Sequence, residues 1–101
     1  MRHHLHIRRF LNRGGHHAGA YVVAAVPDSA SCRIKDCSHL FCGTLVLDIA
    51  DCSRVVHLDF DLDTAARRRN SLHKINTLVD VLTRFRDALE VESARIATRG
   101  R

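Results

Sequence analysis

The stretch that decides the fold is residues 55–82, VVHLDFDLDTAARRRNSLHKINTLVDVL, within which the spacing of the apolar residues changes. Up to Leu62 every second residue is apolar, an alternation typical of a strand with one dry and one wet face. From Leu72 onward the apolar residues recur at intervals of three and four, which predicts an amphipathic helix. We therefore expect a strand followed directly by a long helix, which Asp63 or Thr64 caps.

The helix is expected at about residues 64–97, followed by a short basic tail at 98–101, because no Gly or Pro intervenes before Gly100. At 1.5 Å per residue, about 30 residues would span roughly 45 Å, more than the width of a domain of this size. The helix must therefore bend, fray after about Glu92, or project its end toward a partner. On a heptad register one seam position holds Ile75, Leu82, Leu89 and Ile96, the other holds Leu78 and Phe85, and Glu92 interrupts the seam.

Three further segments have the composition of strands: residues ~4–11, Ala18–Val26 and Gly43–Ala50. Gly14-Gly15 predicts a turn between the first two, because glycine adopts the positive φ angles that hairpins require. Pro27 is expected to end the second strand, since proline cannot donate to the sheet.

Residues 28–42 are polar and aperiodic, which predicts a loop with a short irregular strand at Cys32–Lys35. The expected fold class is α+β: an antiparallel β-meander of about four strands packed on one long C-terminal α-helix. The expected domain organisation is a single domain of residues 1–101, with the sheet at about residues 4–62.

The alternation also assigns strand residues to two sheet faces. The face turned toward the helix is expected to hold Leu5, Ile7, Leu45, Leu47, Leu58 and Phe60. The outer face includes, depending on register, Val22, Ala24, Val26, Val46 and Val55. Such an outer face is less polar than a solvated one should be, which indicates an interface.

The composition, 46% hydrophobic and 27% charged, is that of a small globular protein. No stretch approaches the ~18 apolar residues of a membrane helix, and the first residues lack the apolar core of a signal peptide. We therefore expect a cytoplasmic protein with no membrane partner. The net charge of +5 is uneven, because both ends are basic while residues 21–66 hold seven Asp against three bases. This layout suits self-association or an acidic partner at least as well as nucleic acid.

Four cysteines lie at Cys32, Cys37, Cys42 and Cys52, with His39 among them. Most structural zinc sites begin with a C-x2-C pair, whereas the spacing here is C-x4-C-x4-C-x9-C. Partly buried thiols are therefore favoured, and no cofactor is expected. Zinc stays an alternative, with Cys32, Cys37, His39 and Cys42 as its candidate ligands. A disulfide such as Cys32–Cys42 or Cys37–Cys52 is the alternative for an oxidising compartment.

Asp59, Asp61 and Asp63 are spaced like the first ligands of a calcium loop. That loop requires Gly at its sixth position and Glu at its twelfth, where this chain has Thr64 and Asn70. We expect these acids to keep a strand soluble and to support the start of the helix rather than to bind calcium.

Three consecutive arginines at the start of the helix are unusual, because cations there oppose the helix dipole. One interpretation is a solvated charge run that exposed pairs with nearby Asp residues offset. The other is an anion or phosphate contact. The candidate contacts with a partner or with nucleic acid are Arg67, Arg68 and Arg69, together with the N-terminal Arg8, Arg9 and Arg13.

Catalysis finds little support in the sequence. It contains no G-x-S-x-G elbow, no Walker loop and no G-x-G-x-x-G motif. A Cys37–His39 pair has no neighbouring residue to orient it, and a small two-layer domain offers no deep cleft. The protein is therefore not expected to be an enzyme.

Residues 55–64, VVHLDFDLDT, and residues 70–93, NSLHKINTLVDVLTRFRDALEVES, resemble small orphan proteins of actinobacterial phages and mobile elements. The similarity lies in general features, namely Arg-rich coding and short strands followed by one long helix, over roughly the last 40 residues. It carries no residue with an assigned role. The resemblance implies binding to a host protein or a regulatory role rather than metabolism.

The favoured hypothesis is a non-enzymatic protein-interaction module that self-associates as a homo-oligomer. It depends on the apolar outer sheet face and on a helical stripe longer than the sheet can cover. The alternative is a nucleic-acid-binding regulator that uses Arg67–Arg69 and the N-terminal arginines, with affinity that falls steeply as salt rises.

Overall fold

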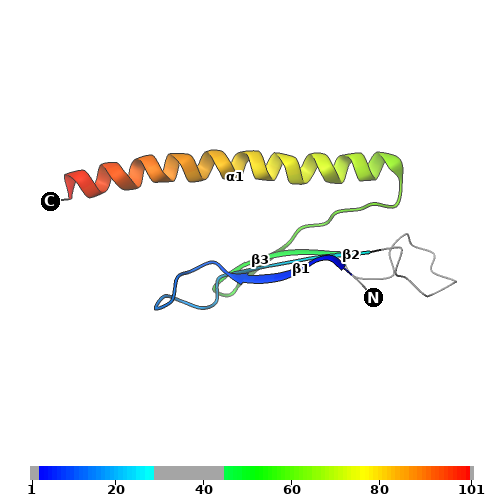
Figure 1. Ribbon diagram of the computed structural model, residues 1–101, viewed down its shortest axis with the longest axis horizontal. Coiled ribbons are helices and arrows are strands. Elements are labelled where there is room, and N and C mark those ends of the chain that lie inside the picture. The colour runs from blue at the N-terminus through cyan, green and yellow to red at the C-terminus, as the bar shows by residue number, and fades with distance from the viewer. Residues whose placement is uncertain (1–2, 29–44, 101) are drawn as a thin grey trace. The chain divides into compact units, whose positions relative to one another are not determined.

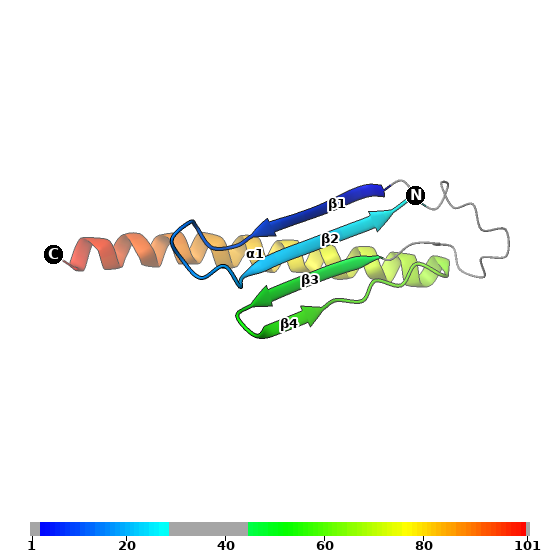
Figure 2. The same ribbon diagram turned by 90° about the horizontal axis from the view of Figure 1, so that it is seen from below.

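The structure, a computed structural model, describes residues 3–28 and 45–100. It contains the strands β1 (His3–Phe10), β2 (Tyr21–Pro27), β3 (Val46–Asp51) and β4 (Arg54–His57), and the helix α1 (Ala65–Arg99) (Figure 1). The strands lie in the order β1-β2-β3-β4, so neighbours in sequence are neighbours in the sheet (Figure 2). All three pairings are antiparallel. The expected α+β class, an antiparallel meander of four strands with one long C-terminal helix, is confirmed.

The sheet and the helix belong to two compact units. The sheet unit is Met1–Asp63 and the helix unit is Thr64–Arg101. The boundary lies where the apolar spacing changes from two to three and four. The single domain of residues 1–101 stays a prediction.

The β1–β2 hairpin has the expected glycine turn. Gly15 has a φ of +91°, in the left-handed region that favours glycine. The loop is longer than a two-residue turn: the Leu11 amide donates to the Ala20 carbonyl at 2.9 Å, and the Asn12 side chain donates to the His17 carbonyl at 2.8 Å. Strand β2 consequently starts at Tyr21 instead of Ala18, and it ends at Pro27 as expected.

The last two strands are shorter than their patterns predict. Strand β3 begins at Val46 rather than Gly43, and β4 ends at His57 although the alternation continues to Leu62. His57 pairs with Asp48, and the Leu58 amide still donates to the Leu47 carbonyl at 2.9 Å. Residues beyond Asp59 have no β3 residue left to face, which explains why alternation alone predicts too long a strand. The expected loop at 28–42 and the short strand at Cys32–Lys35 lie outside the described residues, apart from Asp28.

The register corrects the expected division of the sheet faces. Ile7 pairs with Ala24, and Ala24 pairs with Leu47, so these three side chains share one face. The aliphatic residues of this face, here called the aliphatic face, are Leu5, Ile7, Val22, Ala24, Val26, Leu47, Ile49 and Val56, and Arg9, Asp51 and Arg54 share the face with them. The prediction that places Val22, Ala24 and Val26 on the outer face, away from Leu5 and Ile7, is therefore wrong. Leu45, Leu58 and Phe60 lie outside the strands altogether.

The opposite face, here called the mixed face, is not the apolar surface that the alternation predicts. Val46 and Val55 do lie on it, but so do Asp48 and His57. Its other members are His6, Arg8, Phe10, Tyr21, Val23, Ala25 and Ala50. Among the described residues, the buried apolar side chains are all small: Ala20, Ala25, Pro27 and Ala50. Most of the larger side chains of the sheet therefore retain exposed surface.

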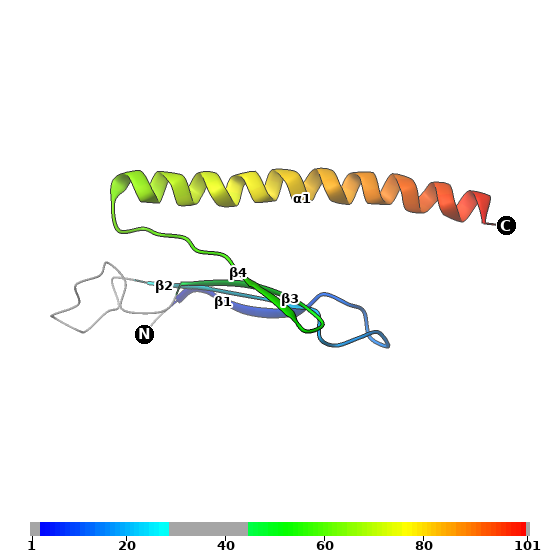
Figure 3. The same cartoon turned by 180° about the vertical axis from the view of Figure 1, so that it is seen from behind.

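Helix α1 begins after Thr64, which is the N-cap. Thr64 has extended backbone angles, and its hydroxyl accepts a hydrogen bond from the Arg67 amide at 3.1 Å. At the other end the Gly100 amide donates to the Ile96 carbonyl at 2.8 Å. The 35 residues form one uninterrupted helix of about 52 Å, which continues through Glu92 instead of fraying there (Figure 3). The expected tail at 98–101 is correspondingly shorter.

Candidate functional site

The apolar stripe of the helix is the most extensive candidate surface of the helix unit. Ile75 and Leu78 are half-buried, and Ser71 is buried. The rest of the stripe is more than half exposed: Leu72, Val79, Leu82, Phe85, Leu89 and Ile96. These side chains recur at intervals of three and four along most of the helix. A stripe of this width is the form in which a helix meets a sheet or another helix.

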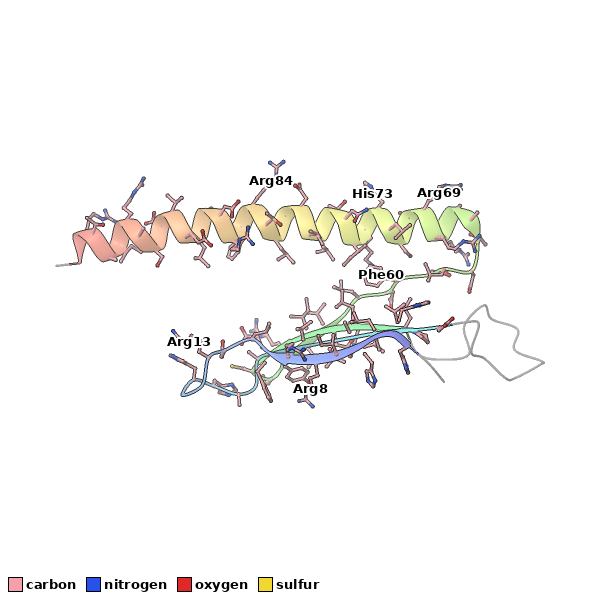
Figure 4. All side chains as sticks on the ribbon, viewed as in Figure 1. Arg8, Arg13, Phe60, Arg69, His73 and Arg84 are labelled. Carbon is pink, nitrogen blue, oxygen red and sulfur yellow. The ribbon has the colours of Figure 1, made fainter. Side chains whose placement is uncertain are left out.

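The polar side chains of the helix pair mainly with one another. Arg84 lies 3.2 Å from Asp80, and Arg86 lies 3.1 Å from Asp87 and 3.9 Å from Glu90. Such exposed pairs stabilise a helix by no more than about 0.5 kcal/mol each. Arg69, His73 and Arg84 project from the same side of the helix (Figure 4). The helix is thus amphipathic, with a continuous polar side opposite its stripe.

Arg67, Arg68 and Arg69 lie in the first turn and a half of α1, and the first turn contains no acidic residue. The Arg67 amide is held by the Thr64 cap, so the start of the helix is well formed despite its unfavourable charge. Asp61 accepts a hydrogen bond from the Asp63 amide at 2.9 Å. This carboxylate therefore supports the backbone just before the helix, as the sequence predicts for the acidic run.

The mixed face of the sheet has an aromatic cluster around Arg8. The Arg8 guanidinium carbon lies 4.7 Å from the ring centroid of Tyr21 and 5.7 Å from that of Phe10. Both distances are within the range of cation–π attraction. Phe10 is 63% exposed, so the cluster lies at the surface. Figure 4 shows Arg8 projecting from its face of the sheet.

Arg9 and Arg13 are placed differently from Arg8. Arg9 pairs with Val22 and lies on the aliphatic face, so it cannot join the aromatic cluster. Arg13 is in the β1–β2 loop, where its carbonyl accepts from the His16 amide at 3.1 Å. The structure thus does not bring the N-terminal arginines to one face.

The β3–β4 edge of the mixed face carries a second polar pair. His57 Nδ1 and Asp48 Oδ1 lie 2.6 Å apart across the two strands, with the His57 side chain largely exposed. At the β1 edge, the rings of His3 and His6 stack with their centroids 5.0 Å apart. The sequence patterns predict neither the Asp48–His57 pair nor the Arg8 cluster. Alternation alone indicates that Arg8 and Phe10 share a face, but only the register brings Tyr21 and His57 to their partners.

The metal and disulfide alternatives concern mainly residues outside the described chain, because Cys32, Cys37, His39 and Cys42 all lie there. Cys52 is described: it is an exposed free thiol with a φ of 59° in the β3–β4 turn. Within residues 3–28 and 45–100, no three His, Cys, Asp or Glu side chains come together as metal ligands. Asp59, Asp61 and Asp63 accordingly do not form a three-carboxylate site.

No helix in the described parts of the chain combines the length and the hydrophobicity that a membrane crossing requires. No model of a protein family matches the chain, and neither a curated protein nor a solved structure matches it.

Proposed function

We propose that this protein is a non-enzymatic interaction module that self-associates through the apolar stripe of α1. The observation that carries the proposal is the exposure of this stripe: Leu82, Phe85 and Leu89 each expose more than half of their surface. Helices in proteins gain most of their stability from packing of an apolar face, so an unpaired stripe is costly. Pairing two such stripes removes that cost.

The length of the helix supports a helical partner. The longest strand, β1, has 8 residues and therefore spans about 26 Å, roughly half of the 52 Å of the helix. A second copy of α1 has an apolar stripe of the same length and spacing. A modest regulatory role toward a host protein, and an origin in an actinobacterial phage or mobile element, stay predictions of the sequence resemblance.

Sedimentation equilibrium between 1 and 100 µM tests the proposal. We expect a dimer or larger homo-oligomer that Leu82→Glu dissociates, because the substitution introduces a charge in the middle of the stripe. Val91→Glu is the matched control. Val91 is 60% exposed, and its position in the heptad lies away from the seam, so this variant should associate like the wild type. A wild-type chain that stays monomeric at tens of micromolar would overturn the proposal.

Nucleic-acid binding is the second candidate, and the Arg8 cluster is the observation that favours it. An exposed aromatic ring beside a guanidinium is a suitable platform for stacking a single-stranded base. Arg67, Arg68 and Arg69 would add phosphate contacts.

Fluorescence polarisation with single-stranded DNA and RNA at 25 and 200 mM salt tests this second candidate. Binding should weaken steeply with salt. Arg8→Ala should weaken it by about tenfold, since it removes both a cation that attracts phosphate and the guanidinium beside the exposed ring. Arg9→Ala, which removes the same charge from the aliphatic face, should have the smaller effect. Absence of binding at 25 mM salt would eliminate this candidate.

A further inference from the structure

Three charged residues occupy seam positions of α1: Arg68 before the apolar stripe, Glu92 between Leu89 and Ile96, and Arg99 after the stripe. On the heptad that places Ile75 and Leu89 at one position, Arg68 lies one heptad before Ile75 and Glu92 lies three residues after Leu89. Arg68 and Glu92 are both exposed, and Glu92 lies 4.0 Å from Arg99 of its own helix. A charge in a seam is tolerated when the partner helix brings an opposite charge to it, and like charges there select against an alignment. Arg68 and Glu92 therefore discriminate between the ways in which two helices can pair.

We infer that α1 pairs with α1 of a second copy in antiparallel orientation, centred near Asp80, with Arg68 of each copy beside the partner's Glu92. The inference rests on the self-association proposed above and adds its orientation and register. In an antiparallel pair, facing residues have numbers with a constant sum, and the Arg68–Glu92 match sets that sum at 160. The same sum places Ile75 against the partner's Phe85 and Leu78 against the partner's Leu82.

Each of these layers occurs twice, because the pair is two-fold symmetric. The centre of the pair is then apolar, the buried Ser71 lies against the partner's Leu89 in the next layer, and the two ion pairs lie at the ends. Val79, which is 55% exposed, lies beside the central layers and has the sum of 160 with the partner's Val81. The overlap from residue 68 to residue 92 covers about 37 Å of helix. Glu92, which interrupts the stripe, thereby forms an ion pair with the partner's Arg68.

Other alignments do not set Arg68 and Glu92 against opposite charges of the partner helix. Sliding the antiparallel pair by one heptad keeps apolar layers at its centre, but it places Glu92 against the partner's Ile75 and Arg68 against the partner's Arg99. A parallel pair contains more apolar layers, but it sets each Arg68 against the partner's Arg68 and each Glu92 against the partner's Glu92. Like charges juxtaposed in this way are destabilising.

The distribution of charge along the helix favours the same orientation. Residues 65–79 contain four bases and no acid, whereas residues 80–99 contain four acids and four bases. A parallel pair would bring together the two Arg67–Arg69 triplets. The antiparallel pair places each triplet alongside the partner's segment that contains Asp87, Glu90 and Glu92.

A set of charge reversals measured by sedimentation equilibrium at 50 mM salt tests the inference. Arg68→Glu creates two Glu–Glu contacts in the antiparallel pair, and Glu92→Arg creates two Arg–Arg contacts. We expect each single variant to raise the dimer Kd by at least about tenfold, since two pairs change from attractive to repulsive. The double variant Arg68→Glu/Glu92→Arg restores both pairs and should bring the Kd back to within about threefold of the wild type.

Arg69→Glu is the matched control, because it makes the same charge change in the same helical turn but on the polar side (Figure 4). It should leave the Kd within about threefold of the wild type. The effect of Arg68→Glu should also fade at 1 M salt, where the screening length is about 3 Å. Circular dichroism of each variant at the same concentration checks that the helix is retained.

The outcomes separate the two claims. A monomeric wild type would overturn the proposed function and this inference together. A dimer in which Arg68→Glu behaves like Arg69→Glu would overturn the antiparallel register alone, because a parallel pair exchanges one like-charge contact for another. A double variant that stays as weak as the single variants would also overturn the register.

Discussion

The sheet unit buries some of its apolar residues, whereas the described part of the helix unit buries none. In the sheet unit, Ala20, Ala25, Pro27 and Ala50 are buried, and each strand pairs with the next in antiparallel orientation. In the described part of the helix unit the one buried residue is a serine, Ser71, while large apolar residues such as Leu82 are exposed. The sheet thus contains the small buried residues that its own pairing requires. The helix contains large apolar residues that become buried only against a second surface, such as the α1 helix of another copy.

This difference predicts in which unit an introduced charge lowers the free energy of unfolding most. Ala50→Asp places a carboxylate at a fully buried position of β3, and we expect it to destabilise the protein by about 3–5 kcal/mol. That is a large part of the roughly 5–15 kcal/mol typical of a domain. Urea unfolding followed by amide hydrogen exchange of β2 and β3 measures the loss.

Ala94→Asp is the matched substitution in the helix. Ala94 is exposed, so the cost should stay below about 1 kcal/mol and arise from helix propensity and from the helix dipole. Equal losses for the two variants would contradict the distinction between a unit with buried alanines and a unit without them.

The second prediction concerns the turn that aligns the first two strands. Gly15→Ala forces a side chain into the left-handed region at a φ of +91°, so it should destabilise the sheet by about 1–2 kcal/mol. Gly14→Ala meets no atom within 4 Å and no such angle, so it should be neutral or stabilising by up to about 1 kcal/mol. Thermal unfolding should therefore show a lower Tm for Gly15→Ala and an unchanged or higher Tm for Gly14→Ala. A loss of stability in both would show that the loop itself, rather than the angle at Gly15, is sensitive.

The same contrast explains how much of the fold the sequence predicts. The change of apolar spacing after Leu62 predicts the end of the sheet unit, a cap at Asp63 or Thr64, and the helix, because those signals are local. The ends of the strands are less predictable. The alternation from Val55 to Leu62 continues past His57, and only the start of β3 at Val46 shows where pairing stops.

The faces of the sheet require the register as well. Ala18–Val26 is apolar on both faces, so its residues can be assigned to either one. The pairing of Ile7 with Ala24 settles the assignment and places Val22, Ala24 and Val26 with Leu5 and Leu47. The same register brings Arg8 to Tyr21. These two residues lie in different strands, and no local pattern links them.

The smallest expected effect is at the start of the helix, where the two units join in sequence. Thr64→Ala removes the hydroxyl that accepts from the Arg67 amide at 3.1 Å, so it should cost about 1 kcal/mol and let the first turn fray. Thr77 is the matched control, because its hydroxyl donates to the His73 carbonyl, which the helix already uses, at 2.8 Å. Thr77→Ala should therefore be neutral or stabilising by a few tenths of a kcal/mol, since alanine is the better helix former. Hydrogen exchange of the Arg67 amide, together with circular dichroism at 222 nm, distinguishes the two.

Because three arginines oppose the dipole in this turn, the cap should contribute more to stability here than in a helix that starts with acids. Thr64→Asp should stabilise the start of the helix further. If Thr64→Ala left the exchange of the Arg67 amide unchanged, the helix would be held at its start by contacts other than its cap.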